Sequence, residues 1–348
     1  MRRSELERRV TASSNGAAVT LEMVAAEAGV SPSTVSRILN GTARVRESKV
    51  RAVETAIAKL KFMPNPVARS LARGKSMSVG VVTQTFESPF YAEALTAIER
   101  GIMRANYSAL FVSGHFREAD ERRCIDHLVS RRVEGIILLN SCLPDQELAN
   151  LARSVPLVIT GRAVEAERIH CLDVDATAGA RLATDYLVGQ GHRRIVFLSG
   201  PSDHADALQR FGGYKAALAT GRIAFDKKLV AAGDYSAVGG LVATNRLLDA
   251  GVAFTAMFAA NDQSAYGAML ALHRRGVRVP KDVSIIGFDD LPASTFTIPP
   301  LTSIHRATDE TGERAAEAII DLIDGRPPAA KASTATLAVR ESTRSLRN

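Results

Sequence analysis

TLEMVAAEAGVSPSTVSRILN, from Thr20 to Asn40, decides the fold of the N-terminal part of this 348-residue chain. Apolar residues recur at helical spacing from Leu21 to Ala28, and Thr20 is a good N-cap just before them. Gly29 can turn the chain at little steric cost, and Ser31-Pro32 combines an N-cap with a proline at the first helical position. The stretch therefore predicts two short helices joined by a glycine turn.

The second of these helices has an outward face of small polar side chains and one arginine. Short side chains allow close approach to the DNA major groove, and arginine can bind guanine through two hydrogen bonds. A solvated polar face on an ordinary helical hairpin is the alternative, but the turn, the cap and the polar face agree on DNA reading. The residues expected to contact DNA from this region are Thr20, Ser31, Pro32, Ser33, Thr34, Ser36, Arg37, Asn40 and Arg44.

A third amphipathic helix is expected from Glu47 to Leu60, where its apolar stripe can cover the first two helices. Asn65-Pro66 then begins a short helical pattern that Gly74 ends. A helix of this length is not stable alone in water, so it should form only when another element holds it. The sequence therefore predicts a conditional hinge at 65–75, with a plain linker as the alternative.

The positive charge of the chain is concentrated at its N-terminal end. Residues 1–75 contain 14 Lys and Arg against 6 Asp and Glu, whereas the remaining residues contain 30 against 31. A basic excess confined to the region of the predicted helix-turn-helix would meet DNA phosphates. Residues 1–19 are polar and lack a long apolar face, and we expect a disordered tail there.

The sequence does not indicate a membrane protein or a metal-binding protein. No apolar run approaches the roughly 20 residues of a membrane span, and the N-terminus lacks the apolar core of a signal peptide, so we expect a cytoplasmic protein without a membrane partner. Cys124, Cys142 and Cys171 have no CxxC spacing and no close histidine, which predicts free thiols and no metal site.

From Ser78 onward, short apolar runs alternate with amphipathic helical windows. This alternation is typical of parallel sheets covered by helices on both faces, so the fold class is α/β, and its two series suggest two doubly wound lobes. Strands are expected at 79–83, 109–113, 135–139 and 156–160 in the first series, and at 195–199, 228–233, 255–260 and 283–287 in the second. A helix at 309–324 and a strand at 334–339 follow both series.

Polar and aromatic side chains follow several of these strands, where such sheets bind ligands. Phe90 and Tyr91 could stack on a sugar, while Arg210, Asn261, Asp262 and Asp289 could bracket hydroxyl groups. Each also has a structural alternative: Arg210 as a surface cation, Asp289 as a helix cap and Phe90 as a core residue.

The sequence lacks the common sequence motifs of nucleotide-dependent enzymes, hydrolases and zinc enzymes. It contains no G-x-G-x-x-G after a strand, no G-x-x-x-x-G-K-[ST] and no G-x-S-x-G. Its seven histidines show no H-x-x-x-H or H-E-x-x-H spacing. We therefore expect a protein that is not an enzyme and needs no cofactor.

The segments VSPSTVSRILNG and PNPVARSL carry a specific resemblance to the DNA-binding headpiece of the lactose/galactose repressor family of transcriptional regulators. Similarity continues through the rest of the chain. The resemblance implies an all-α helix-turn-helix headpiece followed by a two-lobed effector domain similar to periplasmic sugar-binding proteins. In the family, paired hinge helices enter the minor groove, which implies DNA contacts from Asn65, Ala68, Leu71 and Ala72, with Leu71 as the wedge.

The resemblance also implies a domain organisation. A tail (1–19), a helix-turn-helix domain (20–64) and a hinge (65–75) precede an effector-binding and dimerisation domain (76–348). Lobe 1 would comprise about 76–175 plus 307–336, and lobe 2 about 176–306 plus 337–348. The C-terminal STRSLRN lacks the leucine heptads of a tetramer-forming helix, so a homodimer is expected.

For the effector site, the resemblance favours Arg210 and Asp289, and then Phe90, Tyr91 and Asn261. His204, Asp206 and Arg306 lie at positions that vary with the ligand among relatives. Two departures stand out: Pro32 offers no hydrogen-bond donor at a groove-facing position, and Gly161 replaces an aspartate common in relatives. VSGHFREADERRCIDHLVSRRVEGII and SIIGFDDLPAS are most similar to the galactose repressor group, which points to an aldohexose such as galactose.

The expected function is a sequence-specific, DNA-binding transcriptional regulator that represses a carbohydrate-utilisation operon from a pseudo-palindromic double-stranded operator. A small sugar-like effector bound between the lobes would control it. The alternative is a sugar-binding receptor without operator-specific DNA binding, against which the basic N-terminal region argues.

Overall fold

The computed structural model describes residues 19–39, 45–62, 75–172, 175–202, 204–329 and 334–346, and the chain divides into two compact units, Met1–Ser76 and Met77–Asn348. Several predictions fall outside the described residues: the tail up to residue 18, most of the hinge at 65–75, and the proposed DNA contacts Asn40, Arg44, Asn65, Ala68, Leu71 and Ala72.

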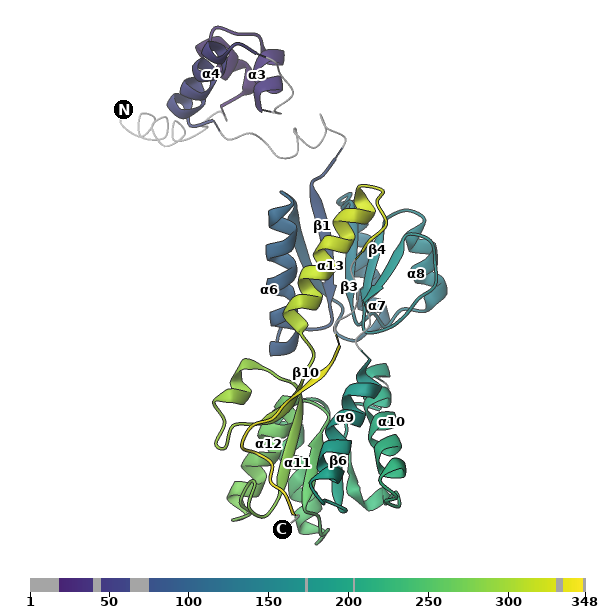
Figure 1. Cartoon of the computed structure of the whole chain (residues 1–348). Coiled ribbons are helices and arrows are strands. Elements are labelled where there is room, and N and C mark those ends of the chain that lie inside the picture. The colour runs from purple at the N-terminus through teal and green to yellow at the C-terminus, as the bar shows by residue number, and fades with distance from the viewer. Residues whose placement is uncertain are drawn as a thin grey trace, which may run out of the picture. The chain divides into compact units, whose positions relative to one another are not determined.

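The first unit contains the three predicted helices, α2 (Leu21–Glu27), α3 (Pro32–Leu39) and α4 (Glu47–Leu60) (Figure 1). The Thr20 hydroxyl accepts a hydrogen bond from the Met23 N–H, and the Ser31 hydroxyl accepts one from the Thr34 N–H at 3.2 Å. Gly29 between them has φ +64°, which favours glycine. Both predicted N-caps and the glycine turn are therefore confirmed.

A small apolar core joins the three helices. Val24, Val35 and Val53 come from different helices, and all three are fully buried. Phe62, just after α4, covers this cluster. An ion pair between Lys59 and Glu27 (2.6 Å) also links α4 to α2, but it is exposed and contributes little stability. Apolar packing therefore sets the angle at which α3 is presented.

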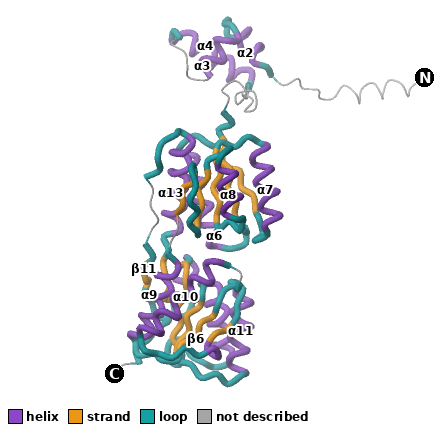
Figure 2. The backbone as a smooth tube through the Cα atoms, turned by 90° about the vertical axis from the view of Figure 1, so that its right-hand side faces the viewer, coloured by secondary structure: helices purple, strands orange, loops and turns teal. Residues whose placement is uncertain are grey.

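The second unit begins with a parallel five-stranded sheet of order β2-β1-β3-β4-β5. Figure 2 shows these strands between layers of helices. The helices α6 and α13 cover one face, and α7 and α8 cover the other. The bounds are β1 (Ser78–Thr83), α6 (Pro89–Arg104), β2 (Ser108–Ser113), α7 (Glu118–Ser130), β3 (Gly135–Leu139), α8 (Asp145–Ala152), β4 (Leu157–Thr160), β5 (Ile169–Leu172) and α13 (Thr308–Ile323).

The second sheet has the order β11-β10-β9-β8-β6-β7, and all neighbours are parallel except β10 and β11. The helices α9 and α10 pack on one face, and α11 and α12 on the other. The bounds are α9 (Ala176–Gly189), β6 (Ile195–Leu198), α10 (Ala205–Thr220), η1 (Lys227–Leu229), β7 (Val230–Ala231), α11 (Ala237–Asp249), β8 (Ala256–Ala259), α12 (Asp262–Arg274), β9 (Ser284–Asp289), η2 (Pro292–Thr295), β10 (Thr302–His305) and β11 (Thr336–Ala338).

The structure departs from the sequence prediction at several strands. β5 and β10 were not expected, and the strand expected at 228–233 is reduced to Val230–Ala231 after a 3-10 turn. β10 reads TSIH and is polar, yet neighbouring groups satisfy its buried hydroxyls: Ser303 donates to Asp262, and Thr302 accepts from the Arg340 N–H. Hydrophobicity alone therefore does not reveal this strand. The expected lobe boundary at 336/337 falls inside β11, because Thr336 already pairs with His305 of the second sheet.

The chain passes from the first sheet to the second after β5, returns through α13, and reaches the second sheet again with β11. Each lobe is therefore completed by residues far apart in sequence. Among the described residues, no helix is both long and apolar enough to cross a bilayer.

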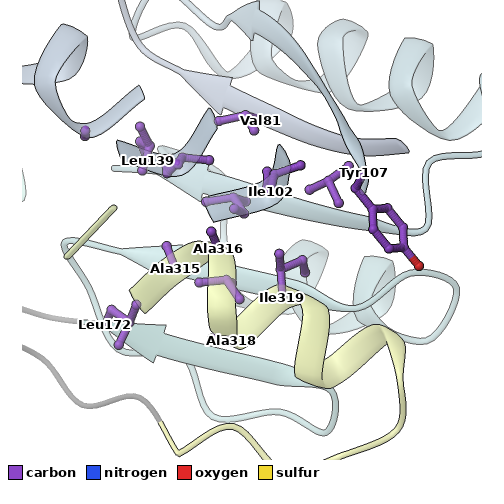
Figure 3. Close-up of a cluster of buried hydrophobic side chains, with 14 of the residues drawn as sticks. Val81, Ile102, Tyr107, Leu139, Leu172, Ala315, Ala316, Ala318 and Ile319 are labelled. Carbon is purple, nitrogen blue, oxygen red and sulfur yellow. The ribbon is translucent and has the colours of Figure 1, made fainter. Parts of the chain in front are cut away.

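The packing of α13 on α6 and the first sheet forms the core shown in Figure 3. Side chains of α13, including Ala316 and Ile319, face Val81 and Leu139 of the strands. A Cβ atom added at Gly101 of α6 would lie 2.5 Å from the Ala316 Cβ, so glycine allows the two helices to approach closely.

We predict that Gly101→Ala destabilises the second unit by about 1–3 kcal/mol, because the new methyl group forces α6 and α13 apart. The matched control is Gly212→Ala in the interior of α10, where an added Cβ meets nothing within 4 Å. The control should gain up to about 1 kcal/mol from the better helix propensity of alanine. Urea unfolding followed by circular dichroism measures both, and equal effects of the two substitutions would contradict the packing argument.

Candidate ligand cleft and DNA-reading helix

A cavity of about 520 Å³ lies where the carboxyl ends of strands from both sheets meet. Phe90 and Tyr91 reach it from the start of α6 after β1, Asn261 follows β8, and Asp289 ends β9. Its volume falls in the range of small-molecule sites, roughly 300–1,000 Å³. Loops of both lobes therefore line a single cavity.

The predicted effector residues gather at this place. The cavity is bordered by Phe90, Tyr91, His204, Asp206, Arg210, Asn261 and Asp289. Arg306 borders a smaller adjoining pocket that shares Phe90 and Tyr91 with the cavity. The alternative of Arg210 as a surface cation is wrong, because its side chain is buried. Ligand contacts by these eight residues remain predictions.

A buried charge cluster forms the floor of the cavity. Asp289 Oδ1 lies 3.7 Å from Arg210 Nη2 and 3.7 Å from Arg306 Nη1, and Arg210 Nη2 lies 3.1 Å from Asp206 Oδ2. Burial raises the pKa of Asp289, while the two guanidinium groups oppose this shift by favouring its charged form. The carboxylate therefore sits between two cations, at distances too long for direct hydrogen bonds.

Several polar atoms of this cluster lack hydrogen-bond partners among the described residues. They are Asp289 Oδ1, the Nε atoms of Arg210 and Arg306, and the Tyr235 hydroxyl. Buried polar atoms are normally paired, and these unpaired ones belong to residues that line the cavity or its adjoining pocket. One acceptor beside several donors suits a molecule with several hydroxyl groups.

Aromatic rings form the walls around the charges. The Arg210 guanidinium lies 4.2 Å from the Phe288 ring centroid, and that of Arg306 lies 5.0 Å from the centroid of Phe90. Phe116 from lobe 1 stacks on His204 from lobe 2, with ring centroids 4.5 Å apart. The rings hold the arginines in place and leave flat apolar surfaces beside polar groups.

Asn261 differs from the expected hydroxyl-binding role. Its Oδ1 caps α12 by accepting from the Ser264 N–H at 3.0 Å, and its Nδ2 donates to the Tyr235 carbonyl at 2.9 Å. Both ends of the amide are therefore engaged within the protein. Asn261 borders the cavity, but it has less free hydrogen-bonding capacity than the sequence suggested.

The sequence analysis did not single out several of the residues that line the cavity, among them Asn140, Phe116 and Tyr235. The Asn140 amide donates to the Tyr91 hydroxyl at 3.1 Å, and Tyr235 lies near the Arg210 guanidinium, 5.2 Å from its ring centroid to Cζ. Asn140 directly follows β3, so the rule that located Phe90 could have found it. Gly161 has φ +82° and lies against Asn140, so a larger side chain there would be strained and would have to displace the Asn140 amide.

The helix α3 presents the predicted DNA-reading face. Pro32, Ser33 and Arg37 are exposed, while Thr34 and Ser36 are half-buried. The Ser31 hydroxyl lies 2.9 Å from the hydroxyls of both Ser33 and Thr34, so these three hydroxyls form a hydrogen-bonded cluster at the N-terminal end of the helix. An exposed arginine behind short polar side chains is an arrangement that can enter a DNA groove.

Comparisons with known proteins match both parts of the chain. Residues 20–65 match the family described as bacterial regulatory proteins, lacI family, and residues 184–343 match a periplasmic binding protein-like domain. The regulator GalR of Escherichia coli (strain K12) is 35% identical over 309 residues, covering 88% of this chain and 90% of GalR. The chain belongs to the lacI family of bacterial regulatory proteins. This is a family of transcriptional regulators rather than of enzymes.

Other lacI-family members are similar over nearly the whole chain. CelR of Thermobifida fusca is 34% identical, covering 93% of this chain and 98% of CelR. A lac repressor dimer bound to operator and the anti-inducer ONPF superposes with a TM-score of 0.86 at 31% identity, covering 94% of this chain and 99% of that one. A CelR–cellobiose complex gives 0.69 at 32% identity, covering 93% and 99%. The recognised family and the two-part fold are therefore confirmed.

We predict that Asp289→Asn weakens sugar binding at least about tenfold, because it removes the charged acceptor between the two arginines while asparagine tolerates the same backbone conformation. Calorimetry with D-galactose, D-ribose and cellobiose measures the loss. Operator binding in the absence of sugar should persist. Asp249→Asn, which alters an exposed ion pair with Arg275, is the control, and equal affinities of the two variants would remove Asp289 from the site.

Proposed function

We propose that this protein is a dimeric, operator-binding transcriptional repressor of a carbohydrate-utilisation operon, acting in the cytoplasm and controlled by a small sugar. The observation that carries the proposal is the presence, on one chain, of a helix-turn-helix with an exposed arginine and a buried, polar, aromatic-walled cavity. Relatives named as transcriptional regulators and as ribose operon repressor support it.

The charge of the cavity favours a neutral ligand. Its lining contains the carboxylates of Glu87, Asp206, Asp234 and Asp289, against which Arg210 and the adjoining Arg306 supply two positive charges. An anionic ligand would face this excess of negative charge, whereas a neutral polyol can donate to carboxylates and accept from guanidinium groups. The bound cellobiose of the CelR complex is a neutral sugar of this kind.

Two copies of the chain would read the two halves of a palindrome, as the symmetry of a dimer requires. In this proposal, α3 of each copy enters the major groove and the segment at 65–75 folds against its counterpart in the minor groove. The lac repressor dimer bound to operator supports this assembly.

A sugar can control DNA binding only if it binds one arrangement of the lobes better than another. Residues of both lobes line the cavity, so a change in the angle between the lobes changes the shape of the cavity. The sugar would therefore bind one arrangement of the lobes more tightly than another. We propose that this change separates the two hinge segments, which are too short to remain helical alone.

A sugar-binding receptor without operator binding is the second candidate, and the match of residues 184–343 to a periplasmic binding protein-like domain favours it. A gel-shift assay separates the two functions. We expect the purified protein to retard an inverted-repeat duplex from the promoter of its own operon, and one sugar of a panel to change this retardation. Sugar binding without preference for that duplex over scrambled DNA would favour the receptor instead.

We predict that Arg37→Ala weakens binding to the specific operator by about 1–3 kcal/mol, because a base contact of arginine is worth about this much. Sugar affinity should be unchanged, because Arg37 lies in the other unit. Fluorescence anisotropy with operator and random duplexes at one salt concentration measures the effect. Arg123→Ala, on the exposed side of α7, is the control. An equal loss on both duplexes would refute base reading.

A further inference from the structure

We infer that Asp262, the first residue of α12, is a positioning residue that holds the turn Asp289–Leu291 in the shape that ligand binding requires. The inference deepens the proposed function, on which it rests. The sequence suggested that Asp262 brackets ligand hydroxyls, but Asp262 does not border the cavity, and its carboxyl oxygens are bonded within the protein. Asp262 is completely buried, and it follows Asn261, which does border the cavity.

The Asp262 carboxyl group makes direct and relayed contacts to the turn. Its Oδ2 accepts from the Leu291 N–H at 2.8 Å and from the Ser294 hydroxyl at 2.6 Å. Its Oδ1 is hydrogen-bonded to the Ser303 hydroxyl, which in turn accepts from the Asp290 N–H at 3.2 Å. Asp262 therefore holds the Leu291 amide directly and the Asp290 amide through Ser303.

This turn needs such support because its backbone is strained. Asp289 has φ +103° and Asp290 has φ +55°, in a region that L-residues other than glycine rarely adopt. Conformations of this kind persist only when the surroundings determine them. Here they direct the Asp289 carboxylate between Arg210 and Arg306. Without the two amide contacts, the turn would be free to relax and move that carboxylate out of the cluster.

The protonation state of Asp262 makes the role testable, because a residue that supports this turn should make the stability of the turn depend on pH. Burial and, to a smaller extent, the charge of Asp289 raise the pKa of Asp262 to about 7, against the opposing effect of the hydrogen bonds from Ser294, Ser303 and Leu291. Besides Asp289 on β9, the titratable group near Asp262 is the Tyr266 hydroxyl of α12, which lies 2.8 Å from Ser294 Oγ. Arg210 and Arg306 lie beyond Asp289.

The direction of the pH effect follows from linkage. A carboxyl group whose pKa is raised by burial stabilises the folded state below its ordinary pKa of 3.8, and this stability is lost as the pH rises through about 7. Opening of the turn returns the carboxyl group to water and relieves the cost of its buried charge, so the turn opens more easily above this pH. The protonated group can still accept from Leu291 and Ser294 through one oxygen and donate to Ser303 from the other. An asparagine side chain can make the same three contacts, so Asp262→Asn mimics the protonated form.

The test measures hydrogen exchange of the Asp290 and Leu291 amides in the full chain from pH 6 to 8, corrected for intrinsic exchange rates. In the wild type, protection should fall as the pH rises through about 7. In Asp262→Asn it should stay high and level, and in Asp262→Ala it should be lost throughout. Asp282→Asn, which alters an exposed ion pair with Arg278, is the control and should follow the wild type. Unchanged protection in Asp262→Ala would overturn the inference.

Ser303→Ala keeps the test decisive if Asp262→Ala fails to fold. It removes only the relay, so exchange at Asp290 should rise while Leu291 stays protected; equal behaviour of the two amides would refute the relay. Calorimetry with D-galactose and cellobiose adds the functional readout, and a sugar that binds the wild type should bind Asp262→Ala about tenfold more weakly. The exchange data decide the role of Asp262 even if neither sugar binds. Failure of the proposed function would appear separately, in the gel-shift assay, as binding without preference for the operator over scrambled DNA.

Discussion

Asp289 is a buried carboxylate held between two buried guanidinium groups, and the construction of the ligand cavity depends on this pairing. A charge removed from water is tolerated only when opposite charges and hydrogen bonds surround it. Asp289 comes from β9, Arg210 from α10 and Arg306 from the segment between β10 and α13. Three elements must therefore be in place before any of the three charges is accommodated.

The same pairing explains why the cavity is polar at its floor and aromatic at its walls. Phe288 and Phe90 lie against the flat faces of the guanidinium groups, which keeps water away from them and orients their N–H groups. Asp289 Oδ1 lies 3.7 Å from a guanidinium nitrogen of each arginine, so the opposite charges are close but do not form direct hydrogen bonds at this oxygen. In the proposed function, hydroxyl groups of the sugar bridge these charges and complete hydrogen bonds that the described residues leave unmade.

The two units of the chain divide the work of regulation. The first has a very small core and an excess of positive charge, so it offers a surface for DNA and little stability of its own. The second has nearly balanced charge and large cores on both faces of two sheets, which makes it a suitable ligand receptor. Because the chain passes between the lobes more than once, a ligand that contacts both of them acts on several connections together.

Local interactions account for what the sequence by itself determined. The N-caps at Thr20 and Ser31, the turn at Gly29 and the alternation of apolar strands with helices depend on neighbours within a few residues, so the helix-turn-helix and the α/β class could be predicted. Cavity residues that directly follow long apolar strands, such as Asp289, could be predicted for the same reason.

Tertiary structure alone decided the features that depend on distant partners. β10 is a polar strand recognisable only by its neighbours, and Tyr235 reaches the cavity because a two-residue strand at a sheet edge places it there. The sequence suggested Asp262 as a hydroxyl-binding group, yet its contacts lie about 30 to 40 residues away within the protein, at Leu291, Ser294 and Ser303. Burial and hydrogen bonding of this kind are fixed by the folded chain as a whole, and no local pattern records them.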